Sequence, residues 1–285
     1  MTPASPTPYF ARTRTDPPTP TQRWGAQLHL LSFDEWAAGR LPYPFTFMLV
    51  FLNILLFAVS AYCSAIVADL VSPGNRIRFS VDTRTLLLFG GAMAHSVRSG
   101  EVWRLVMAGF LHIGPVHLVV NCLGLLCLGP QVERSFGSAR TFSIYLISTI
   151  AGFLGALYFH ALYFHSVQMI VGASVGIAGL LGAFLVTDLR NTKTFTPLEW
   201  SMLLLLSVAS EWIVRQFILI GTAGHIGGFL SGATVAWLCT IRTGGIATSR
   251  LWNVVTTGSV AALVASLGLG PIRLVIRVLW RQHFH

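Results

Sequence analysis

Two side chains with the chemistry of a nucleophile and its base stand inside otherwise apolar stretches of this chain. Ser174 follows Gly172 and Ala173, and His225 follows a glycine. A serine hydroxyl is a weak nucleophile until a base accepts its proton, and histidine titrates in the range that suits this task. Ser174 and His225 are therefore a candidate pair for nucleophilic attack. Because no carboxylate lies near either of them in the sequence, we expect a dyad and not a triad.

A second group of polar residues is suited to stabilise the negative oxygen that such an attack creates. His117 and Asn121 are four residues apart, so a helix would place them on one face. With the backbone N–H of Ser174 at a helix start, they would supply hydrogen-bond donors and a positive dipole end. His112 lies just before them and is a candidate supporting residue. The alternative is that these polar groups only bond backbone carbonyls across a bundle.

The segments around these residues indicate that the protein is embedded in a lipid bilayer. Of the 285 residues, 54% are hydrophobic and 10% are charged, which leaves too little polar surface to coat a soluble globule of this size. The expected fold class is all-α, a polytopic membrane helix bundle with a six-helix core and a seventh C-terminal span. Apolar segments of spanning length lie at about 44–67, 109–129, 140–159, 170–188, 198–220, 225–241 and 252–270.

The positive charge of the chain is interpreted as a topology signal. The formal net charge is +9, but the cations lie between the apolar segments, where Lys and Arg set orientation. Their excess on the N-terminal side predicts a cytosolic N-terminus, or a matrix one in a mitochondrion. We therefore expect no nucleic-acid partner. The four cysteines lack metal-ligand spacing, so we expect no metal and no other cofactor.

Three regions follow from this pattern. Residues 1–41 are rich in Pro, Thr and Arg and are predicted to be a disordered tail. Residues 42–243 would form the six-helix core. Residues 244–285 would hold the seventh span, ended at Gly268 to Pro271, and then an interfacial helix with arginines at intervals of four.

Glycines give a packing reason for the two candidate residues to meet. The fourth apolar segment and the sixth each carry a strip of glycines. These strips predict that the two helices approach closely enough for Ser174 to reach His225. The glycines are Gly172, Gly176, Gly179 and Gly182 in the former and Gly228 and Gly232 in the latter. Residues 216–224, just before His225, are either the last turn of the fifth helix or a mobile cap hinged at Gly221 and Gly224.

These motifs resemble those of the rhomboid family, from about Phe89 to Gly232. The stretch Gly100-Glu101-Val102-Trp103-Arg104 is similar to the family's Trp-Arg loop, and His112, His117 and Asn121 to its H-x4-H-x3-N helix. The stretch from Leu128 to Arg134 with Gly137 resembles its turn between the second and third spans. Gly172-Ala173-Ser174 is similar to the G-x-S motif of the nucleophile, and Gly224-His225 with Gly228 and Gly232 to the motif that carries the base.

The resemblance implies an intramembrane serine endopeptidase whose partners are transmembrane protein substrates and membrane lipid. Ser174 would be the nucleophile, His225 the general base, and His117 with Asn121 the oxyanion stabilisers. Trp103 and Arg104 would fix the first loop, and Gly172 and Gly228 would support the site. By family analogy, a seventh span at the C-terminal end favours the secretory pathway or plasma membrane. The Arg-rich tail keeps the mitochondrial inner membrane as an alternative.

Two positions depart from the family pattern. Val175 follows the serine where the family usually has glycine, and Ala178 stands where an aromatic ring commonly packs on the catalytic histidine. These changes would reduce activity or abolish it. The alternative function is therefore a rhomboid-like pseudoprotease that binds transmembrane helices without cleaving them. The intact polar residues favour the protease, because unused polar groups are costly in a membrane.

Overall fold

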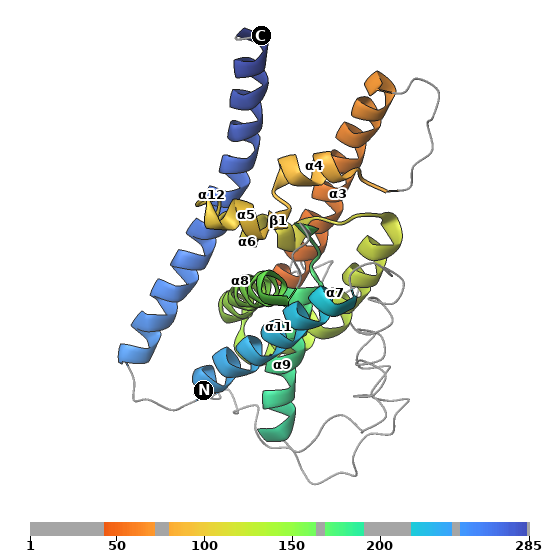
Figure 1. Ribbon diagram of the computed structural model, residues 1–285. Coiled ribbons are helices and arrows are strands. Elements are labelled where there is room, and N and C mark those ends of the chain that lie inside the picture. Colours follow the sequence, from red (N-terminus) through yellow and green to blue (C-terminus); the bar gives the residue numbers. More distant parts are fainter. Residues whose placement is uncertain (1–42, 72–79, 164–168, 191–217, 241–245, 284–285) are drawn as a thin grey trace, which may run out of the picture. The chain divides into compact units, whose positions relative to one another are not determined.

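The computed structural model describes residues 43–71, 80–163, 169–190, 218–240 and 246–283 (Figure 1). The tail at 1–41 and most of the predicted fifth span lie outside these residues. Within them, four helical stretches are long and apolar enough to cross a membrane. They are Pro44–Ile66, Pro115–Phe136, Ser138–Phe159 and Arg250–Leu269. The all-α, polytopic class is confirmed, and the chain is an integral, multi-pass membrane protein.

The first span, α3 (Pro44–Val71), is bound at its N-terminus by a carboxylate of α7 (Pro115–Phe136). Glu133 accepts hydrogen bonds from the N–H groups of Phe45 and Thr46, each at 3.0 Å, and from the Thr46 hydroxyl at 2.8 Å. The first N–H groups of a helix lack partners within it, and that end favours an anion. Glu133 therefore ties α3 to the end of α7.

Between α3 and α7 the chain forms a first loop of short elements. These are α4 (Thr83–Phe89), β1 (Ala92–Met93), α5 (Ala94–Arg98), α6 (Arg104–Met107) and the 3-10 turn η2 (Ala108–Phe110). The N-cap of α4 is Asp82, which accepts from the N–H of Arg84 at 2.8 Å and from the Ser64 hydroxyl at 3.0 Å. Asp82 thus caps α4 and also joins the loop to α3.

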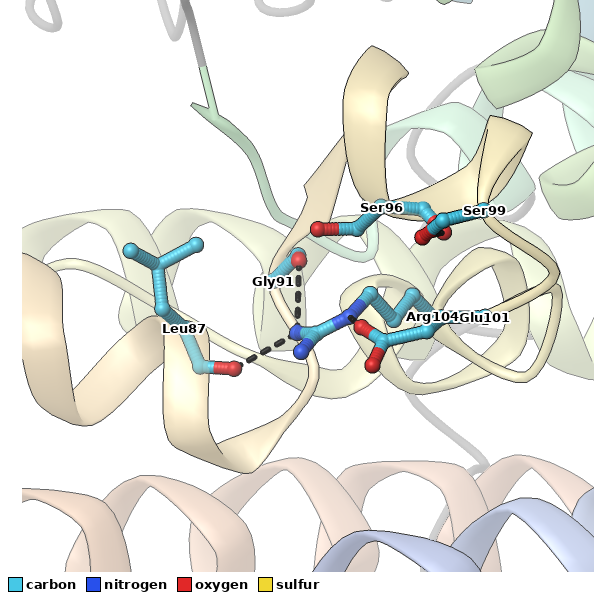
Figure 2. Close-up of polar contacts among 6 residues, drawn as sticks. All are labelled: Leu87, Gly91, Ser96, Ser99, Glu101 and Arg104. Atoms are coloured by element: carbon cyan, nitrogen blue, oxygen red, sulfur yellow. Dashed lines mark hydrogen bonds and ion pairs between the residues drawn. The ribbon is translucent and has the colours of Figure 1, made fainter.

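Arg104 holds this first loop together from inside (Figure 2). Its Nη1 donates to the carbonyl oxygen of Leu87 at 2.5 Å and to that of Gly91 at 3.1 Å. Its Nε pairs with the Glu101 carboxylate at 2.5 Å. The guanidinium offers several donors in one rigid plane, so a single buried side chain joins three parts of the loop. Its carbon Cζ lies 4.8 Å from the centre of the buried Trp103 ring.

The first loop also binds the segment that leads into the fourth span. β1 pairs antiparallel with β2 (Met169–Ile170), with Ala92 opposite Ile170. Two residues after β2, the N–H of Gly172 donates to the carbonyl oxygen of Ala108 at 2.8 Å. The backbone just before Ser174 is therefore fixed by hydrogen bonds to the first loop.

Three helices form the centre of the bundle: α8 (Ser138–Tyr163), α9 (Ser174–Arg190) and α11 (Ile218–Thr240). α9 packs along α11, and α8 packs against both. The main apolar core contains fully buried side chains from several helices. Its members include Leu49 of α3, Phe110 of η2, Leu125 of α7, Tyr145 of α8 and Leu180 of α9.

Two predicted boundaries are wrong. The second span was predicted from residue 109, but α7 begins at Pro115, because residues 108–110 form a 3-10 turn and proline suits the first helical position. The boundary expected between the fifth and sixth spans is wrong as well, because residues 218–224, the described part of 216–224, are neither the last turn of a fifth helix nor a hinged cap. They are the first turns of α11, where Gly221 and Gly224 lie within the helix and do not interrupt it.

The helix itself does not stop at Gly268 to Pro271 as expected, because α12 runs from Ile246 to His283. A proline inside a helix removes a backbone hydrogen bond and tends to kink the helix, but the turns on both sides of Pro271 remain helical. The apolar part of α12 does end at Leu269. α12 packs against α8 and against the first-loop helices α6 and α4.

Candidate active site

The helices that carry the two candidate residues meet at glycines, as their spacing predicts. A Cβ on Gly232 would lie 2.5 Å from the Cα of Gly179, and one on Gly182 would lie 2.9 Å from the backbone N of Ala233. No side chain fits between these backbones, so α9 and α11 are in direct contact. Gly176 was predicted to belong to this strip, but it faces α8, where a Cβ would lie 2.5 Å from the Thr149 hydroxyl oxygen.

This contact brings Ser174 and His225 together. Ser174 is the first residue of α9, and His225 lies two turns into α11. The Ser174 Oγ is 2.7 Å from the His225 Nε2, a hydrogen-bond distance between residues 51 positions apart in the chain. Both residues are half-buried. A hydroxyl in this position can transfer its proton directly to the imidazole.

The ring of His117 lies against Gly172, two residues before the serine. A Cβ on Gly172 would be 2.9 Å from both Cε1 and Nε2 of His117 and 3.6 Å from the Ser174 Oγ. Asn121, one turn further along α7, is buried and donates one amide N–H to the His117 carbonyl oxygen at 2.8 Å. The second N–H of that amide remains for another acceptor. His112 is fully buried, with its ring edge-to-face against His117 and 5.0 Å between centroids.

α8 supplies supporting residues that the sequence analysis did not identify. The Tyr145 hydroxyl donates to the carbonyl oxygen of Gly109 at 3.1 Å. Thr149 lies against Gly176, and a Cβ on Gly152 would be 2.6 Å from the carbonyl oxygen of Gly224. Tyr145, Thr149 and Gly152 are spaced by four and three residues, so they lie on one face of α8. This spacing could have identified them from the sequence.

The other predicted site residues lie in supporting places. Trp103 and Arg104 are buried in the first loop, and Gly228 lies at the contact of α11 with α9. Within the described ranges, no three His, Cys, Asp or Glu side chains gather as metal ligands would. A hydroxyl bonded to an imidazole, with a second imidazole and an amide nearby, is chemically suited to acyl transfer.

The fold and this site together define a class: multi-pass membrane helix bundles with a serine–histidine pair shared between two helices. The sequence profile of the Rhomboid domain matches residues 99–242, just over half of the chain. The chain therefore belongs to the rhomboid family.

Known relatives match this chain over much of its length. It is 34% identical to the Rhomboid protease GluP of Bacillus subtilis (strain 168) over 176 residues, which is 62% of this chain and 34% of GluP. It is 32% identical to RHOMBOID-like protein 1 of Arabidopsis thaliana over 227 residues, 74% of this chain and 57% of that protein. Rhomboid-like protease 3 of Toxoplasma gondii is 26% identical over 207 residues, 71% of this chain and 76% of that protein. The match thus spans only part of the length of GluP and of RHOMBOID-like protein 1.

Proposed function

We propose that this chain is an intramembrane serine endopeptidase that cleaves transmembrane segments of other membrane proteins, with Ser174 as nucleophile and His225 as general base. The observation that carries the proposal is the distance of 2.7 Å between the Ser174 Oγ and the His225 Nε2. Polar groups inside a membrane are costly, and here two of them meet from separate helices. Membership of the rhomboid family supports the same reaction.

The proposed reaction proceeds in two half-reactions. The His225 Nε2 accepts the proton of Ser174 while Oγ attacks the scissile carbonyl carbon. The imidazolium then donates that proton to the leaving amine, which yields an acyl ester on Ser174 and releases the C-terminal fragment. A water molecule, deprotonated by His225, attacks the ester, and the proton returns to the Ser174 oxygen as the acid product leaves.

Three donors would stabilise the oxyanion of each tetrahedral intermediate. The His117 ring lies beside Gly172 and near the Ser174 Oγ. Asn121 has a second amide N–H besides the one bonded to His117. The backbone N–H of Ser174 lies at the N-terminus of α9, where N–H groups lack helical partners. Donors fixed in place by the fold act most strongly on the charge that develops in the transition state.

The substrate requirement follows from the chemistry of a helix. Carbonyl groups inside a transmembrane helix are hydrogen-bonded and hidden, so an intact helix cannot present one to Ser174. Substrates should therefore carry glycine or other helix-weakening residues near the cleavage site. Specific substrates would be identified by their loss of cleavage when such residues are replaced with leucine.

A pseudoprotease that holds transmembrane helices is the second candidate function. It is favoured by Ala178, whose methyl group is too small to cover an imidazole as an aromatic ring does, and by Val175. Against it, Val175 is fully accommodated in the bundle and the hydrogen bond between Ser174 and His225 is intact. We therefore favour the enzyme.

Labelling with a fluorophosphonate tests the choice between enzyme and binder. The wild-type protein in detergent or proteoliposomes should be labelled and should cleave a glycine-containing transmembrane reporter, and both activities should vanish in Ser174→Ala and His225→Ala. Ser231→Ala is the control, because the hydroxyl of this serine of α11 donates to the Gly228 carbonyl oxygen of its own helix at 3.0 Å. A wild type that is neither labelled nor active would reject the protease and favour the binder.

We further propose that residues 42–243 form the catalytic core and that 244–285 form an appended seventh span with a basic end. The seventh span favours the secretory pathway or plasma membrane, and the Arg-rich tail leaves the mitochondrial inner membrane as the alternative. Imaging of the tagged full-length chain against markers of each membrane distinguishes these locations.

A further inference from the structure

Val175 occupies an unusual place for a branched side chain in this site. It is 3% exposed and belongs to an apolar cluster that includes Phe153 and Ala156 of α8 and Ile170 of β2. The family pattern usually has glycine at this position, next to the serine. In this chain the valine side chain occupies space that a glycine would leave empty.

The two methyl groups of Val175 reach glycines of two other helices. Cγ1 lies too close to where a Cβ on Gly152 of α8 would be for both to fit, and 3.1 Å from where a Cβ on Gly228 of α11 would be. Cγ2 lies 3.3 Å from the position of a Cβ on Gly224. The valine thus takes the volume that three glycines leave open, between α8 and α11.

These contacts surround the histidine. Gly224 directly precedes His225, and Gly228 follows it by three residues, while Val175 itself directly follows Ser174. One side chain is therefore adjacent to the nucleophile in sequence and in contact with the backbone on both sides of the base. Because valine has a strongly preferred rotamer in a helix, it forms a stiff spacer.

We propose that Val175 is a positioning residue: by filling the space among Gly152, Gly224 and Gly228, it fixes how the segment of α11 that carries His225 packs against α8, next to Ser174. This inference rests on the proposed function. The small Ala178 cannot brace the His225 ring as an aromatic residue would, and Val175 acts on the backbone beside His225. Removal of the spacer would let α11 shift, and a misplacement of about 1 Å at a reacting group can lower the rate by about 10²-fold.

Three substitutions in the full-length protein separate positioning from stability. Val175→Ala removes both γ-carbons, and Val175→Gly restores the usual family residue while emptying the space completely. Val175→Thr keeps the branched shape but places a hydroxyl in an apolar cluster. Val186→Ala is the matched control, because this valine is on the same helix and packs on the main core away from the dyad.

The readouts are the rate of fluorophosphonate labelling, kcat and KM for a transmembrane reporter, and the melting temperature of each variant. We expect Val175→Ala and Val175→Gly to lower the labelling rate and kcat about tenfold or more, with KM nearly unchanged. Val175→Thr should keep most of the rate although it melts earlier, and Val186→Ala should melt earlier with its rate retained.

Two results would overturn the inference, and they differ from failure of the proposed function. If Val175→Gly is labelled as fast as the wild type, Val175 does not position the dyad. If the rate follows melting temperature across all four variants, its role is only structural. If the wild type is not labelled at all, the proposed protease function fails, and the positioning role is rejected with it.

Discussion

The imidazole of His117 lies so close to Gly172 that no side chain fits between them. A Cβ on residue 172 would be 2.9 Å from two atoms of that ring. Gly172 also has a φ of +135°, a conformation that residues with a Cβ rarely adopt. Two separate constraints, the backbone angle and the lack of space, thus act on one residue just before Ser174.

Gly172→Ala should abolish most of the fluorophosphonate labelling. The methyl group would displace His117 and shift the backbone that carries Ser174, so we expect a loss of about 10²-fold or more. Gly137→Ala is the control, because Gly137 has a φ of +78° but nothing within 4 Å of an added Cβ. It should suffer backbone strain of about 1–3 kcal/mol without the collision. Equal losses of labelling in the two variants would show that strain alone matters.

His117→Phe should lower kcat by about 10²-fold and leave KM within about twofold. Phenylalanine keeps a ring beside Gly172 but has no N–H to donate, and removal of one oxyanion donor costs about 10²–10³-fold in kcat. Cleavage kinetics of a transmembrane reporter measure both constants. His95→Phe, at an exposed position of α5, is the control and should be neutral. A rise in KM with unchanged kcat would assign His117 to substrate binding.

Arg104→Lys should loosen the first loop although the charge is kept. A lysine ammonium cannot reproduce the planar set of donors that reaches Leu87, Gly91 and Glu101. We expect faster hydrogen exchange of backbone amides across residues 83–110 and a several-fold lower rate of labelling. Arg98→Lys is the control at an exposed position of the same loop. Unchanged exchange in Arg104→Lys would mean that the loop is held by its apolar contacts.

The capping residue Asp82 gives a pH dependence to the stability of the first loop. Burial raises its pKa, but hydrogen bonds from Thr85, Ser64 and Arg84 outweigh burial, and the net pKa is lowered from 3.8. The folded state therefore favours the carboxylate. Its contribution is fully present above about pH 4 and is lost as the pH falls through the lowered pKa.

Asp82→Ala should accordingly cost about 1 kcal/mol at neutral pH, and the difference from the wild type should shrink below pH 4. Unfolding in detergent at a series of pH values measures this difference. Asp82→Asn, which can still cap a helix, should lose less at neutral pH and show little acid dependence. A difference between wild type and Asp82→Ala that stays constant down to pH 3 would contradict the assignment.

Much of the architecture could be predicted because lipid imposes strict rules on sequence. Every spanning segment must be a long apolar helix, so α3, α8 and the apolar part of α12 were located to within a few residues. The errors lie where local composition is ambiguous. Residues 109–114 are as apolar as a span, but they form the end of a 3-10 turn and an extended stretch in which the Ile113 carbonyl oxygen accepts from the N–H of Val81 at 2.8 Å.

Details of packing were harder to predict than the helices. The glycines of the predicted fourth span were all assigned to one contact with the sixth, but Gly176 faces α8, and Gly172, which precedes α9, faces His117. A run of small residues shows that neighbours come close, but it does not show which neighbour lies on each side. Gly152 was missed for the same reason, because its partners are far from it in the sequence.

The sequence by itself determined the class of molecule and the candidate chemistry, since hydropathy, glycine spacing and the types of polar residue inside spans are local properties of the chain. The tertiary structure alone decided that Ser174 and His225 lie at bonding distance and that Val175 fills the space beside them. These facts depend on the rotation of each helix about its axis and on its depth against its neighbours. Such quantities are set by contacts across the whole bundle and are not written in any one segment.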